Sequence, residues 1–262
     1  MEYFKICEGI PVYITDTEKG EKCIVLLHGY LETSAVWENF TDLLKSEYRV
    51  ITLDLPGNGL SGTHETINSM EFMADVVSCV LKHAGVETAT IVGHSMGGYA
   101  ALAFAEKYDT QTEKLCLFHS TPNADTDEKK QNREREINLI KEDKLQVILN
   151  VNVKNMFAKE NEKKMADTIE MIKENATISD STGIIACLRG MMERKDMNSF
   201  LSGFKKPLLF IFGKKDNYIP ESVALELIEK FPEADSILLE NSGHAGFFEE
   251  PQICANKLLN LP

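Results

Sequence analysis

The amino-acid sequence predicts an α/β fold with helices on both faces of a mostly parallel, eight-stranded sheet. Three observations carry this prediction. Apolar, β-branched runs alternate with segments of helical periodicity, which is the pattern of βαβ units. The run Cys23-Ile24-Val25-Leu26-Leu27 is apolar without interruption, as a strand covered on both faces should be. A Gly-x-Ser-x-Gly sequence at Gly93–Gly97 lies between such a run and a helical segment.

Eight strand-like runs are spread along the 262 residues, and helical patterns separate most of them. The strand-like runs are 3–7, 11–15, 23–27, 49–53, 90–92, 114–118, 208–213 and 236–240. The helical segments that alternate with them are 36–44, 69–84, 99–108, 221–231 and 250–259. Glu8-Gly9 separates the first two runs, which should therefore form a hairpin. A chain of this length can bury one large core.

Segment 69–84 shows the helical pattern most fully. Its apolar side chains recur at helical spacing, at Met70, Met73, Val76, Val77, Val80 and Leu81. Ser69 can cap the first turn, because its hydroxyl can accept from a backbone N–H that has no partner inside the helix. Gly85 can end the helix, because glycine adopts the left-handed conformation without strain.

The alternation is interrupted once, between the sixth and seventh strand-like runs. Residues 121–204 contain no strand-like run and are rich in Glu, Lys, Met and Asn. Helix candidates within this insertion are 127–140, 144–150, 162–174 and 183–193. We predict a core domain of residues 1–120 and 205–262 and an inserted helical cap of residues 121–204. The charge run 127–136 is expected to be a solvated helix face.

The negative charge of the chain is concentrated outside this insertion. The formal net charge is −13, whereas residues 121–204 contain 14 Lys and Arg and 15 Asp and Glu, a balance of −1. The remaining residues therefore carry −12. This acidic surface disfavours nucleic acid and anionic membranes as partners. We expect a small-molecule substrate and a monomer or homodimer.

The sequence contains no pattern typical of secretion, membrane insertion or metal binding. Residues 1–12 lack a basic stretch followed by an apolar one, and no apolar run approaches the ~20 residues of a membrane span. No His, Asp or Glu group has metal-ligand spacing, so we expect no metal and no cofactor. We expect a cytoplasmic protein with reduced, mostly buried thiols. The six cysteines are Cys7, Cys23, Cys79, Cys116, Cys187 and Cys254.

The Gly-x-Ser-x-Gly sequence has the local setting in which it predicts a nucleophile. Ser95 would stand on a sharp turn between a strand and a helix, and such a turn needs small neighbours at Gly93 and Gly97. Gly98 leaves room for close packing of the helix. Backbone N–H groups at the helix N-terminus can stabilise developing negative charge.

A serine nucleophile needs a base, and the base needs an acid that orients it. Asp216 follows the strand-like run 208–213, and His244 lies on a small-residue loop after the run 236–240. Residues just past the carboxyl ends of parallel strands share one edge of the sheet, so these positions can converge on Ser95. Asp125 and Asp196 are the alternative acids, although neither follows the seventh strand-like run.

With these motifs the chain resembles the serine hydrolases of the α/β-hydrolase fold, in the group of small esterases, lactonases and perhydrolases. The resemblance covers nearly the whole length and rests on ordered segments: Leu27-His28-Gly29-Tyr30, Asp54–Ser61, the Ser95 turn, Gly213–Pro220 and Gly243-His244. Its chain order of nucleophile, acid and base is the one that this fold uses. Arg189–Asp196 also resembles a joint between cap and core in this group.

The resemblance implies a serine esterase mechanism without a cofactor. Ser95 would attack the acyl carbonyl, His244 would accept and return the proton, and Asp216 would orient His244. The backbone N–H groups of Tyr30 and Met96 would form the oxyanion hole. Candidate pocket residues are His119, Phe157, Met191, Tyr218 and Phe247.

Other polar residues near these motifs are expected to have supporting roles. His28 should support the oxyanion loop by hydrogen bonding, and His94 should pack beside the nucleophile turn. His64 and His83 are expected at surface or helix positions. Arginines of the cap meet substrate carboxylates in some relatives of this group. For Arg189 and Arg194 of this chain, a role at the surface or at the joint between cap and core is favoured.

Several activities remain compatible with this set of residues. The favoured one is hydrolysis of carboxylic esters with small or medium acyl groups. The same residues could cleave a C–C bond, a thioester or a lactone, or catalyse perhydrolysis. A non-catalytic ligand receptor is the third class, although the sequence retains every member of the expected triad.

Overall fold

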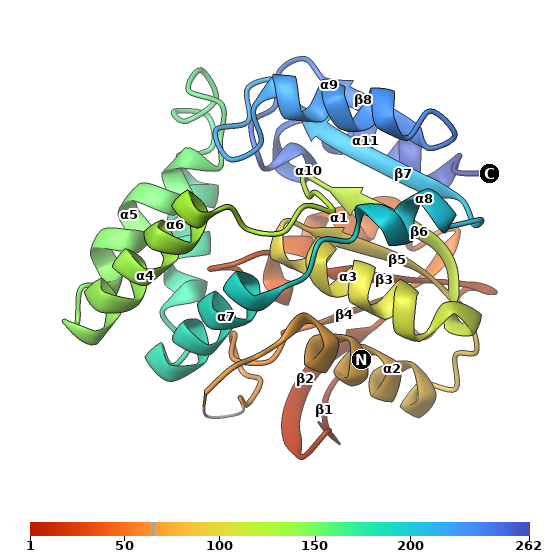
Figure 1. Cartoon of the computed structure of the whole chain (residues 1–262). Helices are drawn as coiled ribbons and strands as arrows, with labels where there is room; N and C mark the ends of the chain where they lie inside the picture. The colour runs from red at the N-terminus through yellow and green to blue at the C-terminus, as the bar shows by residue number, and fades with distance from the viewer. Residues whose placement is uncertain (64–65) are drawn as a thin grey trace.

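The computed structural model describes residues 1–63 and 66–262, and within them one eight-stranded sheet forms the centre of the molecule (Figure 1). The strands are β1 (Glu2–Cys7), β2 (Ile10–Asp16), β3 (Lys22–Leu27), β4 (Tyr48–Leu53), β5 (Ala89–His94), β6 (Thr112–Phe118), β7 (Leu208–Gly213) and β8 (Asp235–Leu239). Their order is β1-β2-β4-β3-β5-β6-β7-β8. Only the pairs β1–β2 and β2–β4 are antiparallel among these described strands. The predicted mostly parallel sheet is confirmed.

Helices follow most strands, as the alternating pattern predicts. They are α1 (Glu38–Leu44), α2 (Met70–His83), α3 (Met96–Lys107), α4 (Asp127–Lys141), α5 (Leu145–Asn155), α6 (Ala166–Ala176), α7 (Ser181–Glu193), α8 (Asn198–Gly203), α9 (Glu221–Lys230), α10 (Gly246–Glu249) and α11 (Pro251–Leu259). The short helices α8 and α10 were not expected, and the first helical segment opens with a 3₁₀ turn at Ser34–Trp37. His64 lies outside the described residues.

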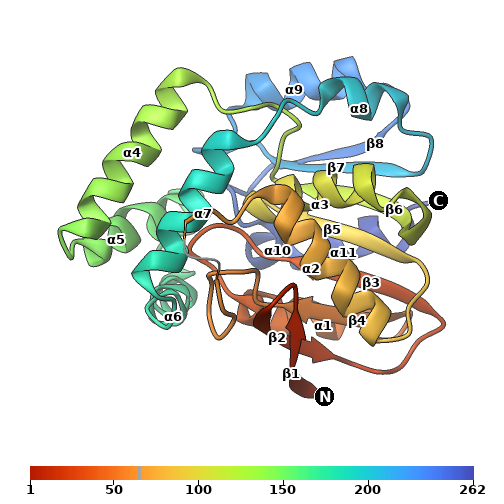
Figure 2. The same cartoon turned by 60° about the horizontal axis from the view of Figure 1, so that its bottom comes forward.

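The helices form layers on the two faces of the sheet. Helices α2 and α3 pack together on one face, and α1 and α11 pack together on the other (Figures 1 and 2). Every residue of β5 is buried, as expected for a central strand. The insertion between β6 and β7 supplies α4 to α7, which stand together beyond the ends of the strands in both views. Helix α8 lies beside β7.

Helix α2 begins and ends where its sequence predicts. The Ser69 hydroxyl accepts a hydrogen bond from the Phe72 N–H at 3.1 Å. Gly85 follows the helix with a φ of +68°, in the left-handed region that glycine tolerates. Met73, Val77 and the other apolar side chains of the helix are buried against the sheet. The capping residues and the buried apolar residues therefore place the ends of α2 where the local sequence predicts them.

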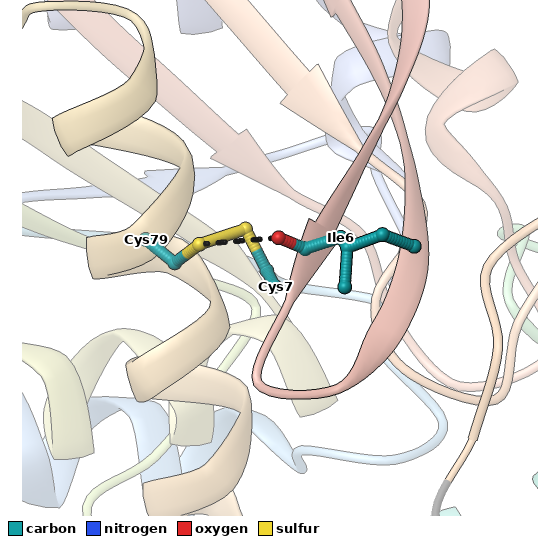
Figure 3. Close-up of a disulfide and its surroundings, with 3 residues drawn as sticks. All are labelled: Ile6, Cys7 and Cys79. Carbon is teal, nitrogen blue, oxygen red and sulfur yellow. Dashed lines mark hydrogen bonds between the residues drawn. A yellow bond between two sulfur atoms is a disulfide. The ribbon is translucent and has the colours of Figure 1, made fainter.

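The cysteines do not all remain reduced, which corrects one expectation. Cys7 at the end of β1 and Cys79 in α2 form a disulfide with a Cα–Cα distance of 5.7 Å (Figure 3). Their sulfurs lie beside the Ile6 carbonyl. The other cysteines are free and buried. Seventy-two positions separate the bonded residues, so sequence spacing gave no signal of the pair. Only the packing of the hairpin on α2 brings them together.

The disulfide bears on the expected location of the protein. Disulfides persist in oxidising compartments and are rare in the cytosol, so the Cys7–Cys79 bond counts against the cytoplasmic expectation. Among the described residues, no helix is long and apolar enough to cross a membrane.

Candidate active site

The nucleophile turn joins β5 to α3 and holds Ser95 in a strained backbone conformation. Ser95 has φ 50° and ψ −113°, a combination that non-glycine residues rarely adopt. Its N–H donates to the Phe118 carbonyl at 3.0 Å, and its carbonyl accepts from the Ser120 hydroxyl at 2.8 Å. Both partners come from β6 or directly after it. The neighbouring strand therefore fixes the turn that presents the Ser95 side chain.

The glycines around this turn are required by close backbone contacts. A Cβ on Gly93 would lie 2.2 Å from the Gly97 carbonyl oxygen, and one on Gly97 would lie 2.4 Å from the Leu27 oxygen. A Cβ on Gly98 would lie 2.3 Å from the Ser120 hydroxyl. A larger residue at any of these three positions would push α3 away from the sheet. The small-residue pattern read from the sequence thus has a steric cause.

Asp216 and His244 come from different loops and form a short, buried hydrogen bond. His244 Nδ1 lies 2.7 Å from Asp216 Oδ2. The other carboxylate oxygen accepts from the N–H groups of Tyr218 and Ile219 at 2.7 and 3.0 Å. Burial by itself would raise the pKa of Asp216, but the two neighbouring histidines hold it well below its ordinary value. Asp216 is therefore a carboxylate, and it accepts a hydrogen bond from the Nδ1–H of His244.

The loop that carries His244 is attached to the inserted segment. The His244 N–H donates to the Met156 carbonyl at 2.6 Å. Glu249 accepts from the Gly243 N–H with one oxygen and from the Ala158 N–H with the other, at 2.7 and 2.8 Å. The position of the candidate base thus depends on residues that follow α5, as well as on the sheet.

His119 lies on the far side of Asp216 rather than on a solvent-facing wall. Its Nδ1 is 3.4 Å from Asp216 Oδ2, and its Nε2 accepts from the Gly246 N–H at 3.0 Å. Because Nε2 accepts, the proton of the neutral ring is on Nδ1 and points at the carboxylate. Burial lowers the pKa of His119 to about 4, so the ring is neutral at pH 7.

The candidate oxyanion groups lie at the ends of β3 and β5. Neither the Tyr30 nor the Met96 N–H donates a hydrogen bond within the described part of the chain. The close contact between Gly97 and the Leu27 and His28 carbonyls brings the two strand ends together. The Tyr30 hydroxyl is buried, and burial followed by the nearby Glu136 carboxylate raises its pKa well above the ordinary value.

Most of the candidate pocket residues prove to be core residues. His119, Phe157, Met191 and Phe247 are each at most 2% exposed, so none borders solvent in this structure. The Phe247 ring packs 4.5 Å from Trp37 in an aromatic cluster that also includes Phe40 and Phe118. That these four side chains line a substrate pocket stays a prediction, since apolar residue type gives no way to tell a pocket wall from the core.

Tyr218 is the exception among the candidate pocket residues. It is 36% exposed, and its ring lies 4.9 Å from the His244 ring. Its hydroxyl donates to the Asn152 carbonyl in α5 at 2.8 Å. The side chain therefore spans from the candidate base to the inserted helices.

Most of the charge run 127–136 is exposed, as expected for a solvated helix face, but Arg133 and Glu136 are only partly exposed. Arg133 on α4 pairs with Asp125 at 2.6 Å, and its side chain is only 17% exposed. Arg194 pairs with the other oxygen of Asp125, also at 2.6 Å. Asp125 is thereby committed to two arginines, and Asp196 accepts from Asn198. Neither alternative acid contacts the candidate base.

These contacts also place the two cap arginines. Arg194 bonds the Met191 and Asn123 carbonyls and stacks on Tyr99, which fits a joint between insertion and core. Arg189 donates to the Thr66 carbonyl.

The histidines before and within the nucleophile region have different partners. His28 donates from Nδ1 to the Gly29 carbonyl and accepts at Nε2 from the Leu55 N–H, at 2.8 and 2.9 Å. This agrees with the expected loop support. His94 was expected only to pack, yet it forms a fully buried ion pair with Glu32 at 2.9 Å. Glu32 carried no sequence signal, because no motif of the chain includes it.

One group of described residues has the arrangement of metal ligands, which differs from the expectation from spacing. Ligand atoms of His119, Asp216 and His244 all lie within 4.8 Å of one another. In this structure His244 Nδ1 is hydrogen-bonded to Asp216 and His119 Nδ1 lies 3.4 Å from the same carboxylate oxygen, and two of the three residues are the candidate acid and base.

Comparisons with known proteins agree with the fold. The family model described as "alpha/beta hydrolase fold" matches residues 22–136. A hydrolase of 2-hydroxy-6-oxononadienedioate and 2-hydroxy-6-oxononatrienedioate from Paraburkholderia phymatum is 26% identical, with 99% of this chain and 94% of the relative covered. A pimeloyl-[acyl-carrier protein] methyl ester esterase from Vibrio vulnificus is 25% identical, with 91% and 93% covered. A thermophilic esterase structure from Thermogutta terrifontis superimposes with a TM-score of 0.92 at 25% identity, covering 99% and 97%.

Proposed function

From the premise that the chain is a hydrolase of the α/β-hydrolase fold, we propose that it is a serine esterase acting on small-molecule carboxylic esters. The observation that carries the proposal is the strained Ser95 turn together with the 2.7 Å pair of Asp216 and His244. A neutral His244 with its Nδ1 proton held by Asp216 leaves Nε2 able to accept a proton from Ser95.

The reaction follows from these roles. The Ser95 hydroxyl attacks the acyl carbonyl while His244 takes its proton, and Asp216 stabilises the imidazolium that forms. The Tyr30 and Met96 N–H groups stabilise the oxyanion. His244 then donates the proton to the leaving alcohol, and water hydrolyses the acyl-enzyme by the same base. Residues 121–204 act as a cap, in keeping with their contacts to the His244 loop.

Cleavage of a C–C bond is the second candidate, because a relative of this length is named as a hydrolase of oxo-dienedioates. The nucleophile turn and the acid–base pair serve either reaction, so the substrate decides between them. Esters with small or medium acyl groups are favoured, since esterases stand among both the sequence relatives and the similar structures.

The test is kcat/KM on p-nitrophenyl esters from acetyl to palmitoyl, with Ser95→Ala as the matched variant. We expect turnover by the unmodified chain and a loss of about 10⁴-fold or more in kcat for Ser95→Ala. The acyl chain length with the highest kcat/KM indicates the size of the acyl pocket. Wild-type turnover by Ser95→Ala contradicts the proposal. If no ester is turned over but a vinylogous 1,5-diketone is cleaved, the esterase proposal is wrong and hydrolysis of a C–C bond takes its place.

A further inference from the structure

His94 lies between the nucleophile turn and the loop of the candidate base, and both of its ring nitrogens are engaged. Nδ1 lies 2.9 Å from Glu32 Oε2, and Nε2 lies 2.8 Å from the backbone carbonyl oxygen of His244. His94 and Glu32 are each 1% exposed. The ring is surrounded by aromatic side chains, among them Trp37 and Phe247. Water therefore cannot replace either partner.

The partners determine the protonation state of His94. A carbonyl oxygen can only accept, so Nε2 carries a proton. Glu32 Oε2 accepts from the Gly29 N–H at 2.5 Å. Two protonation states satisfy the contact with Nδ1: a carboxylate that accepts from an Nδ1 proton, or a neutral carboxyl group that donates its own proton to Nδ1. The Gly29 N–H favours the carboxylate, because it stabilises negative charge on the oxygen that accepts from it, and a carboxylate there makes His94 an imidazolium.

The electrostatic environment agrees with this assignment. Burial would lower the pKa of His94, but Glu32 outweighs it and the pKa is raised above its ordinary value. Burial would likewise raise the pKa of Glu32, but His94 and the Gly29 N–H hold it below its ordinary value. Asp216, His28, His119 and His244 are the other titratable groups near the pair. Each partner stabilises the charged form of the other.

The pair connects three parts of the candidate machinery. Glu32 holds Gly29, which directly precedes the oxyanion candidate Tyr30. His94 directly precedes Ser95 and holds the backbone of His244. A Cβ on Gly29 would lie 2.8 Å from His94 Nδ1, so the loop and the ring are in close contact. Displacing the pair would move the base and the oxyanion loop relative to the nucleophile.

We propose that Glu32 and a doubly protonated His94 form a positioning ion pair that fixes the His244 backbone and the oxyanion loop relative to Ser95. His94 does not touch the reacting atoms and takes no proton from Ser95. Its catalytic consequence rests on the proposed hydrolase function, whereas its protonation state is a property of the folded chain. Because small misplacements of reacting groups reduce turnover strongly, loss of the pair should lower kcat about 100-fold with KM changed less than about threefold.

The first test reads protonation without using activity. Protein labelled with ¹⁵N-histidine should show one side chain with both ring nitrogens protonated from pH 6 to 8, and the signal should be absent in His94→Gln. In Glu32→Gln the amide can donate to Nδ1, so His94 should become a neutral ring with one N–H. A single protonated nitrogen on His94 in the unmodified chain overturns the proposal.

The second test separates positioning from stability. We compare kcat, KM and the rate of Ser95 labelling by a fluorophosphonate for Glu32→Gln, His94→Gln and the control Asp16→Asn. Asp16 forms an ion pair with Arg49 at 2.6 Å between β2 and β4, in which Asp16 is buried and the Arg49 side chain is 22% exposed. All three variants should lose stability, but only the first two should lose kcat and label slowly.

The outcomes distinguish the two proposals. Unchanged kcat in folded Glu32→Gln and His94→Gln, with lowered stability alone, overturns the positioning role. Loss of kcat in Asp16→Asn as well also overturns it, because any lost ion pair would then have the same effect. Absence of ester turnover in the unmodified chain contradicts the proposed function, while fluorophosphonate labelling and the histidine spectra still test the ion pair.

Discussion

His94 and His119 are both buried histidines beside the candidate base, and both face a carboxylate, yet they differ in charge. The difference arises at the nitrogen that points away from the carboxylate. In His94 that nitrogen meets the His244 carbonyl, an acceptor, whereas in His119 it meets the Gly246 N–H, a donor. An acceptor requires a proton on that nitrogen, which together with the Nδ1 proton facing Glu32 makes an imidazolium, whereas a donor forbids a proton there. The comparison teaches that a single backbone group can decide the charge of a buried histidine.

Asp216, the carboxylate beside His119, should have the largest effect on catalysis, because it also orients His244 through the 2.7 Å hydrogen bond. Asp216→Asn should lower kcat by about 10⁴-fold, since the asparagine amide favours the wrong tautomer of His244. Steady-state kinetics on the preferred ester measure the loss. Thermal unfolding serves as the control, because it separates a loss of stability from a loss of kcat. An unimpaired Asp216→Asn would remove Asp216 from the triad and move the acid elsewhere.

The disulfide tests whether losses at the two histidines come from general destabilisation. Cys79→Ser opens a link that spans 72 positions, which should lower the free energy of unfolding by about 4 kcal/mol. The bond joins β1 to α2, neither of which carries a candidate catalytic residue, so kcat of the folded fraction should not change. Denaturant unfolding with and without reductant gives the measurement. Equal stability of the two redox states, or two free thiols in protein purified without reductant, would contradict the bond.

The two histidines should give opposite pH dependence of stability. The pKa of His119 is lowered to about 4 from 6.5, so the unfolded chain binds more protons between these values. Its contribution, about 3 kcal/mol, is present above pH 6.5 and is lost as the pH falls toward 4. The pKa of His94 is raised, so its contribution is present below pH 6.5 and is lost as the pH rises through the raised value.

Urea unfolding from pH 4 to pH 9 measures both effects. His119→Gln should flatten the stability profile on the acid side of pH 6.5, and His94→Gln should flatten it on the basic side. Gln at 119 offers an acceptor for the Gly246 N–H and an N–H donor but no titratable group, which makes it a conservative replacement. Identical acid-side slopes in the unmodified chain and His119→Gln would show that His119 is not held neutral by the fold.

Local sequence predicted the elements that depend on local physics. The cap at Ser69 and the stop at Gly85 follow from backbone hydrogen bonding and from glycine geometry, and both are present. The parallel sheet follows from the alternation of continuous apolar strands with amphipathic helices. The small-residue requirement at Gly93 and Gly97 could be stated from sequence because a strand that turns sharply into a helix leaves no space for a Cβ.

Features that depend on distant contacts were not predictable in the same way. The Cys7–Cys79 bond joins elements that meet only after the hairpin packs on α2. Apolar type alone does not distinguish a pocket wall from the core, and Phe247 and Phe157 are both buried. The inward stripe of α4 carries Arg133, which is neutralised by Asp125 from the preceding loop. Such pairing hides a charge that the sequence pattern assigns to solvent.

The sequence by itself determined the α/β architecture, the Ser95 turn and the chain order of the candidate nucleophile, acid and base, because each follows from local periodicity, glycine placement or spacing. The tertiary structure decided which histidines carry charge and what they hold. His94 and His119 are indistinguishable as residue types, but protonation depends on the donor or acceptor that packing places against each ring. Those partners lie 150 and 127 positions away in the chain, where no local pattern reaches.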